Sequence, residues 1–342
     1  MENSRELSEF YTQEITQFRA EWEIPKAYSD ITHLSAGQYG TVARGFVKNP
    51  VTRQVLGISD FVGYDDDNNP TPRDHSKPHV VIKRLQTPFY DKTLAKRCMR
   101  EIAILKHLHG FRDHINIMSI YQVFSPDDWK TDLANLKEIY ISTSYDGTPL
   151  DNLIGQMQAG HLRMEIEHIA FLSYQLLCGL NYIHTSAIVH RDIKPSNIVV
   201  DEGLNLKIID FGLARSVKST SREMTDFTQT NRDLTTYVQA RAYRAPELLW
   251  LLNEDVIYDT SIDIWSFGLI LMELLLAYPI FLCDNEATHC LTMIELLGKI
   301  TYFDQLNENI VNALRMYMSV CKRITNSSFS LDLKKPLLSF FF

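Results

Sequence analysis

The stretch IVHRDIKPSNIVVDEGLNLKIIDFGLAR, residues 188–215, decides how the rest of this chain is interpreted. It holds two carboxylates, Asp192 and Asp210, each on a short polar segment beside an apolar run typical of a strand. Lys194 and Asn197 lie within one turn's reach of Asp192. One interpretation of these acids is that they are ordinary turn residues between strands. The other is that they form a catalytic group.

Transfer of a phosphoryl group from ATP requires a set of groups like this one. One carboxylate orients the attacking hydroxyl, a second carboxylate and an amide oxygen hold Mg²⁺, and a cation meets the charge on the γ-phosphate. The spacing HRDxKPxN followed by DFG matches the protein-kinase signature at eight positions in order. The chain therefore resembles a eukaryotic protein kinase, and the resemblance implies ATP and Mg²⁺ as cofactors.

The resemblance also implies a role for each polar residue of the stretch. Asp192 would be the catalytic base and Lys194 the γ-phosphate contact, with Asn197 and Asp210 as Mg²⁺ ligands. His190 and Arg191 would be structural and regulatory members of the motif. Gly212 would let the backbone turn after the metal ligand, because glycine tolerates positive φ without strain.

Composition excludes several other classes of protein. The 342 residues are 45% hydrophobic and 22% charged, which is ordinary for a soluble globular protein. The net charge of −8 argues against a nucleic-acid partner. Five scattered cysteines without a CxxC pair indicate neither a zinc site nor a disulfide framework, so a reduced compartment is expected, the cytoplasm with the nucleus as a second location. The N-terminus lacks the apolar core of a signal peptide.

The longest apolar run, residues 264–282, leaves two interpretations open. Its length allows a membrane span, but Glu273 interrupts it and basic flanks are missing. At this position it also resembles the central buried helix of the kinase large lobe. We expect the buried helix and no membrane partner.

Residues 34–47 and 79–108 resemble the nucleotide-binding part of the kinase small lobe. Leu34, Gly37, Gly40 and Val42 fit the later part of a glycine-rich loop, although Ser35 stands where its first glycine would be and GxxG alone would more often be a hairpin turn. Lys83, on the apolar strand HVVIKRL, matches the lysine that holds the α- and β-phosphates. Glu101 matches its ion-pair partner on the helix AKRCMREIAILKHL.

The remaining predicted nucleotide contacts lie near a hinge between the lobes. Thr143, at the end of the strand IYISTS, would border the adenine pocket, and Tyr145 and Asp146 would lie in the hinge. Val81 departs from the usual alanine above the adenine. Residues 49–79, rich in Asp, Asn and Pro, are predicted to form a solvated loop that is inserted between two strands.

The segment LTTYVQARAYRAPE, residues 234–247, narrows the resemblance to mitogen-activated protein kinases, most closely their stress-activated branch. Thr235 and Tyr237 would be dual phosphorylation sites. A phosphothreonine needs bidentate donors, and six arginines match the family's phosphate pockets: Arg97, Arg100, Arg191, Arg215, Arg241 and Arg244. The other interpretation is that these arginines are solvated. Two departures are the long lip 216–234 and Ala242, which replaces a tryptophan near the site for the substrate's proline.

The resemblance covers residues 8–330. Residues 314–329 are expected to be the family's inserted helical region, although Lys322–Thr325 could instead carry the arginine that pairs with Glu247. The predicted organisation is α+β and two-lobed, with a lead-in at 1–30, a small lobe at 31–143 and a large lobe at 144–342, shortened before its last helices.

Two functions are compatible with this organisation. The first is an ATP-dependent serine/threonine kinase of the mitogen-activated type in a stress cascade, switched on at Thr235 and Tyr237 and proline-directed. Its expected partners are protein substrates, a dual-specificity upstream kinase and phosphatases, and it would act as a monomer. The second is a catalytically weak or inactive kinase-fold scaffold or competitor.

Overall fold

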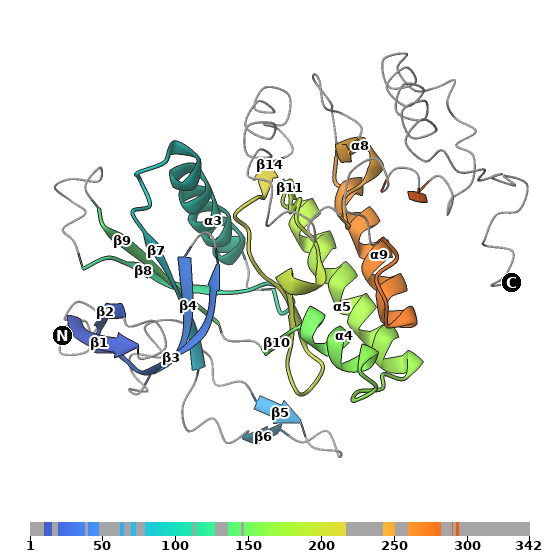
Figure 1. The fold of residues 1–342 in the computed structure, drawn as a ribbon, viewed down its shortest axis with the longest axis horizontal. Coiled ribbons are helices and arrows are strands. Elements are labelled where there is room, and N and C mark those ends of the chain that lie inside the picture. Colours follow the sequence, from blue (N-terminus) through green and yellow to red (C-terminus); the bar gives the residue numbers. More distant parts are fainter. Residues whose placement is uncertain are drawn as a thin grey trace, which may run out of the picture. The chain divides into compact units, whose positions relative to one another are not determined.

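The computed structural model describes residues 10–15, 20–37, 40–47, 62–64, 70–72, 79–111, 114–126, 136–144, 147–216, 242–249, 259–281, 289 and 292–293. The chain forms two compact units, which are described separately here. The first contains residues 1–147 and 209–212, and the second contains residues 148–208 and 213–342. Figure 1 labels their elements.

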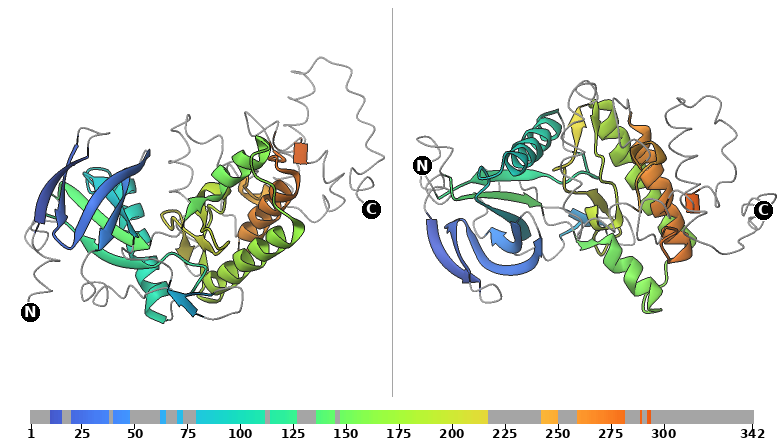
Figure 2. Two further views of the ribbon diagram at one scale, coloured as in Figure 1. Left: turned by 90° about the horizontal axis from the view of Figure 1, so that it is seen from below. Right: turned by 45° about the horizontal axis from the view of Figure 1, so that its top comes forward.

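An antiparallel sheet of five strands is the framework of the first unit (Figure 1). Its order is β3 (Tyr28–Gly37), β4 (Gly40–Val47), β7 (His79–Gln86), β9 (Glu138–Ser144) and β8 (Ile120–Phe124). The N-terminal hairpin of β1 (Phe10–Ile15) and β2 (Ala20–Pro25) and the helix α3 (Lys92–Phe111) pack on this sheet. Figure 2 shows them on its two sides.

Alternation along β7 decides which residues meet the hairpin and which meet the helix. Val80 and Ile82 are fully buried in the core cluster that also contains Trp22 of β2. Lys83, the residue after Ile82, points to the opposite face of the sheet, where it reaches Glu101 of α3. Side chains of a strand point alternately to the two faces of a sheet. The central strand β7 therefore places Ile82 in the core beside the hairpin and Lys83, the functional candidate, on the face covered by α3.

The helix α3 buries one stripe against the sheet. Cys98, Glu101, Leu105 and Leu108 are buried, and their spacing of three and four residues places them on one face. Asp91, just before the helix, accepts a hydrogen bond from the Thr93 backbone N–H at 2.9 Å, which satisfies one of the free donors at the helix start. Glu101 thus lies on the buried stripe rather than in water.

The predicted loop at 49–79 contains two short strands. β5 (Val62–Tyr64) pairs with β6 (Pro70–Pro72) as a hairpin. The expectation of a loop without regular structure is therefore wrong for these residues. Three-residue strands carry too short an alternation to be recognised in a polar sequence. The rest of the predicted insertion, except His79 at the start of β7, lies outside the described residues.

The second unit is mainly helical. Its elements are β10 (Thr148–Pro149), α4 (Leu150–Gln158), α5 (Ile166–Thr185), β11 (Ile188–Val189), η2 (Pro195–Asn197), β12 (Ile198–Val200), β13 (Leu206–Ile208), β14 (Arg215–Ser216), α8 (Pro246–Leu249) and α9 (Ser261–Leu276). β12 pairs with β10 and β13, and β11 pairs with β14. A sheet-rich unit followed by a helical one confirms the predicted α+β class.

The apolar run that begins at Ile264 forms most of α9, which packs against α5. Two acids of α9 are buried with partners: Asp263 is bonded to residues of 184–191, and Glu273 accepts a hydrogen bond from the Tyr243 hydroxyl. Within the described part of the chain, no helix combines the length and the apolar character needed to cross a membrane.

Candidate active site

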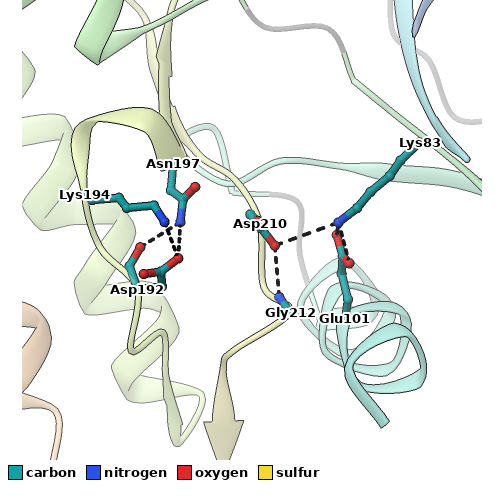
Figure 3. Close-up of polar contacts among 7 residues, drawn as sticks. All are labelled: Lys83, Glu101, Asp192, Lys194, Asn197, Asp210 and Gly212. Carbon is teal, nitrogen blue, oxygen red and sulfur yellow. Dashed lines mark hydrogen bonds and ion pairs between the residues drawn. The ribbon is translucent and has the colours of Figure 1, made fainter. Parts of the chain in front are cut away.

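The first unit holds a half-buried lysine beside two carboxylates (Figure 3). Lys83 Nζ lies 2.9 Å from Glu101 Oε1 and 2.8 Å from Glu101 Oε2, and 3.9 Å from Asp210 Oδ1. The Glu101 side chain is 6% exposed and that of Lys83 is 22% exposed, whereas that of Asp210 is 46% exposed. The predicted Lys83–Glu101 ion pair is therefore present and largely shielded from water.

The carboxylates keep Lys83 charged. Burial by itself would lower the pKa of the Lys83 amine, but the charges of Glu101 and Asp210, with the hydrogen bond to Glu101, outweigh it and raise that pKa. The amine is therefore a fixed positive charge at neutral pH. A fixed cation beside a more exposed carboxylate suits the binding of an anion together with its counter-cation.

Asp210 occupies an unusual backbone conformation. Its φ is +62°, in the left-handed region that is costly for a residue with a Cβ. Its Oδ1 accepts a hydrogen bond from the Gly212 backbone N–H at 3.2 Å. Strain of this kind persists where surrounding contacts hold it, and it is often found at functional sites.

The second unit brings three of the predicted catalytic residues together. Asp192 Oδ2 accepts hydrogen bonds from Lys194 Nζ and from Asn197 Nδ2, both at 2.8 Å. Asn197 Nδ2 also donates to the Asp192 backbone carbonyl at 2.8 Å. Because the amide nitrogen is held by Asp192, the amide oxygen points away from it, as Figure 3 shows. Pro195–Asn197 forms a 3₁₀ turn that makes this short-range arrangement possible.

Asp263 of α9 holds the backbone of the loop that carries Asp192. Its side chain is 1% exposed. Its Oδ2 accepts from the His190 N–H at 2.8 Å and contacts His184 Nε2 at 2.9 Å, while its Oδ1 accepts from the Arg191 N–H at 2.8 Å. Arg191 itself has φ +71°. Sequence reasoning missed Asp263, although an acid two residues before a tryptophan at the start of an apolar helix was a visible signal.

The turn between β3 and β4 requires glycine at one position. Gly40 has φ +148°, and a Cβ placed there would lie 2.1 Å from the Arg84 carbonyl oxygen. Val42 pairs with Lys83, and Thr143 is buried opposite Val81. Leu34 is 41% exposed on β3, and Gly37 pairs with Gly40. The other two predicted nucleotide contacts, Tyr145 and Asp146, lie outside the described residues.

The arginines predicted for phosphate pockets are distributed over both units. Arg97 and Arg100 are half-buried on α3 of the first unit. In the second unit, Arg191 and Arg244 line one small cavity together with Asp192, and Arg215 donates to the Ala214 carbonyl at 3.0 Å. Arg244 is buried. Arg241, Thr235 and Tyr237 lie outside the described residues, as do the lip at 217–234 and residues 314–329.

These features define the class to which the protein belongs. The protein kinase domain family matches residues 71–335, which is most of the chain. The chain therefore belongs to the protein kinase domain family, as its HRD and DFG stretches predicted.

Within that family the chain is similar to stress-activated mitogen-activated protein kinases. It is 34% identical to mitogen-activated protein kinase p38a of Drosophila melanogaster over 84% of this chain and 64% of the relative. It is 33% identical to p38b of the same organism over 86% and 66%, and 32% identical to mitogen-activated protein kinase 14 of Xenopus laevis over 84% and 64%. The alignments thus span slightly less than two thirds of the length of these curated relatives.

Proposed function

We propose that this protein is an ATP-dependent serine/threonine kinase of the mitogen-activated type. The observation that carries the proposal is the closed Lys83–Glu101 ion pair, with both Glu101 oxygens within 2.9 Å of the amine. The bonded group of Asp192, Lys194 and Asn197 in the second unit supports it. A chain without catalytic function has no chemical need to keep all of these.

Asp192 would act on the hydroxyl of the substrate. Both of its side-chain hydrogen bonds reach Oδ2, so among the described residues Oδ1 accepts none that competes with a hydroxyl. The hydroxyl oxygen would form a bond to the γ-phosphorus while the bond from that phosphorus to the bridging oxygen breaks and ADP leaves. The hydroxyl proton would pass to Asp192, and the Lys194 cation would offset the charge on the transferred group.

Lys83 and the glycine turn would bind the phosphates of ATP. The raised pKa of the Lys83 amine, caused by the two carboxylates overcoming its burial, keeps it cationic for the α- and β-phosphates. Gly40 lacks a side chain, so the backbone can approach a phosphate closely. The Asn197 amide oxygen and the Asp210 carboxylate are each the kind of oxygen donor that Mg²⁺ prefers, and they would hold the ion. Mg²⁺ would neutralise charge on the phosphates.

Regulation would come from phosphorylation of Thr235 and Tyr237 by an upstream dual-specificity kinase, reversed by phosphatases. Each phosphate adds nearly two negative charges and needs arginine partners. The supporting feature is the group of arginines at 97, 100, 191, 215, 241 and 244. Substrates would be intracellular proteins with serine or threonine before proline, in a stress-response cascade.

A phosphate-transfer assay tests this function. It measures transfer from Mg²⁺–ATP to a Ser-Pro peptide by the chain that carries phosphate at Thr235 and Tyr237. We expect Asp192→Asn to lower the transfer rate by about 10² to 10⁴-fold, the usual contribution of a positioned base. Asp201→Asn is the matched control, because the Asp201 carboxylate accepts hydrogen bonds from Gly203 and Asn205 of its own turn. Equal rates in the wild type and Asp192→Asn would remove the proposed role.

A thermal melt separates the kinase from a non-catalytic scaffold. Mg²⁺–ATP at about a hundredfold over its dissociation constant should add about 2.7 kcal/mol to the free energy of unfolding. The gain should be smaller in Lys83→Met and unchanged in Asp192→Asn. A chain that melts cooperatively without any shift and transfers no phosphate would be the scaffold.

A further inference from the structure

Strand β7 carries two neighbouring cations on opposite faces of the sheet. Lys83 points to α3 and Glu101, while Arg84 points to the N-terminal hairpin. The Arg84 side chain is 8% exposed, so it is more buried than that of Lys83 at 22%. Burying a guanidinium is costly unless it is paired. The buried Arg84 guanidinium is therefore expected to have a partner nearby, and Glu138 is that partner.

Three side chains from other strands enclose Arg84. Its guanidinium lies 5.6 Å from the ring centre of Trp22, which is fully buried on β2. Arg84 forms an ion pair with Glu138 of β9, and Glu138 also accepts a hydrogen bond from the Tyr140 hydroxyl. Trp22 and Tyr140 meet edge to face at 5.6 Å. Trp22, Arg84, Glu138 and Tyr140 form a closed group, which we call the outer clamp.

The backbone of Arg84 also contacts the glycine turn. The Arg84 carbonyl oxygen lies 2.1 Å from where a Cβ on Gly40 would be. Thr41 of β4 pairs with Arg84, and Val42 pairs with Lys83. Residue 84 therefore contacts the hairpin through its side chain, the glycine turn through its carbonyl, and Lys83 through the peptide bond.

We propose that Arg84 is a positioning residue that holds Lys83 against Glu101 and sets the glycine turn over the phosphates, with the N-terminal hairpin as its support. This deepens the proposed function, on which its nucleotide-binding part rests. Residues 83 and 84 share one peptide bond and point to opposite faces of the sheet, so the backbone cannot shift at Arg84 without moving the Cα of Lys83. Holding Arg84 on one face therefore holds the base of the Lys83 side chain on the other. The hairpin thus becomes part of the nucleotide-binding apparatus.

Amine labelling of Lys83 tests the positioning without any nucleotide. The purified chain is treated briefly with acetic anhydride at pH 8, and mass spectrometry compares labelling of Lys83 with that of the exposed Lys92. In Arg84→Met we expect the Lys83/Lys92 labelling ratio to rise several-fold, because an amine that is no longer held against both Glu101 oxygens meets the reagent more often. Arg84→Lys keeps the charge but loses the planar fork, so it should give an intermediate ratio.

Two further variants separate positioning from general loosening. Ile15→Val trims the same hairpin within its buried cluster and keeps all four members of the outer clamp, so its ratio should equal that of the wild type. Tyr140→Phe removes only the hydroxyl that bonds Glu138, and it should raise the ratio slightly. If Arg84→Met does not fold, Tyr140→Phe and Trp22→Phe give the same test with milder changes.

Titration with Mg²⁺–ATP provides the second measurement. We expect Arg84→Met to raise the dissociation constant several-fold while the relative kcat at saturating ATP changes less. An unchanged Lys83 ratio in folded clamp variants would overturn the inference, as would an equal rise in Ile15→Val. A wild type that binds no nucleotide would overturn the proposed function instead, and the labelling ratios would still decide the role of Arg84.

Discussion

Replacing Asp263 by asparagine should loosen the loop that carries Asp192 without changing the size of the side chain. The Asp263 carboxylate accepts two backbone N–H groups, those of His190 and Arg191, and also contacts His184 Nε2. The new amide keeps one oxygen and replaces the other by an NH₂ group, which cannot accept. One backbone N–H therefore loses its acceptor in a place that is 1% exposed to water.

The cost follows from the kind of hydrogen bond that is lost. A buried donor left unsatisfied costs about 1–3 kcal/mol, and a hydrogen bond to a charged group is worth about 1 kcal/mol more than one to a neutral group. One lost bond and two weakened ones lower the free energy of unfolding by about 3–5 kcal/mol. A domain has about 5–15 kcal/mol in total, so the variant should fold but be visibly weaker.

Urea unfolding measures this difference, with Asp259→Asn as the matched control four residues earlier in the chain. Asp259 is exposed and accepts the Ser261 N–H at 2.8 Å at the start of α9. Asparagine and aspartate accept a backbone hydrogen bond at a helix start about equally well, so the control should change by less than about 0.5 kcal/mol. For Asp263→Asn the midpoint should fall by about 1–2 M urea with an unchanged slope, given a slope of about 3 kcal/mol per M, the upper end of the usual range because the slope increases with chain size.

The reasoning would be refuted by equal midpoints of the two variants. That result would mean that the loop around Asp192 keeps its conformation without the carboxylate of α9. A second check is the phosphate-transfer rate. If Asp263 holds the loop that carries Asp192, the phosphate-transfer rate of Asp263→Asn should fall even without urea, when the chain is fully folded. The rate of Asp259→Asn should stay unchanged.

Two further predictions concern pH and glycine. Burial, and then the charge of Arg244, lower the pKa of His289 to about 4. The unfolded chain therefore binds a proton at His289 more readily than the folded chain does. Between neutral pH and pH 5 this residue should lower the free energy of unfolding by about 2 kcal/mol. His289→Leu should remove that part of the acid sensitivity in urea unfolding at the two pH values, and an unaltered pH dependence would contradict it. Gly40→Ala should lower the unfolding free energy by about 2 kcal/mol or more, because of its φ of +148° and the clash with the Arg84 carbonyl. Gly155→Ala, inside α4 with nothing within 4 Å, should raise it by about 0.5–1 kcal/mol; a loss in both variants would count against the argument.

Local patterns predicted much of the fold. The helix expected around residues 95–108 is α3 (Lys92–Phe111), and the strand expected at 79–85 is β7 (His79–Gln86). Their ends differ by a few residues because Asp91 caps the helix and Gln86 pairs with Glu138 of β9. The hairpin inside 62–72 was missed, since strands of three residues leave almost no periodicity.

The sequence by itself determined the class of the protein and the candidate chemistry, because the HRD and DFG segments and the Lys83–Glu101 pair depend on residue type and short spacing. Only the tertiary structure decided how these groups are held. Asp263 meets His190 from 73 positions away, and the ring of Trp22 meets Arg84 across two strands that are far apart in the chain. Buried polar groups need hydrogen-bond partners, and packing of the sheet and helices decides which groups lie close enough to serve. Local sequence patterns do not show which distant residues these are.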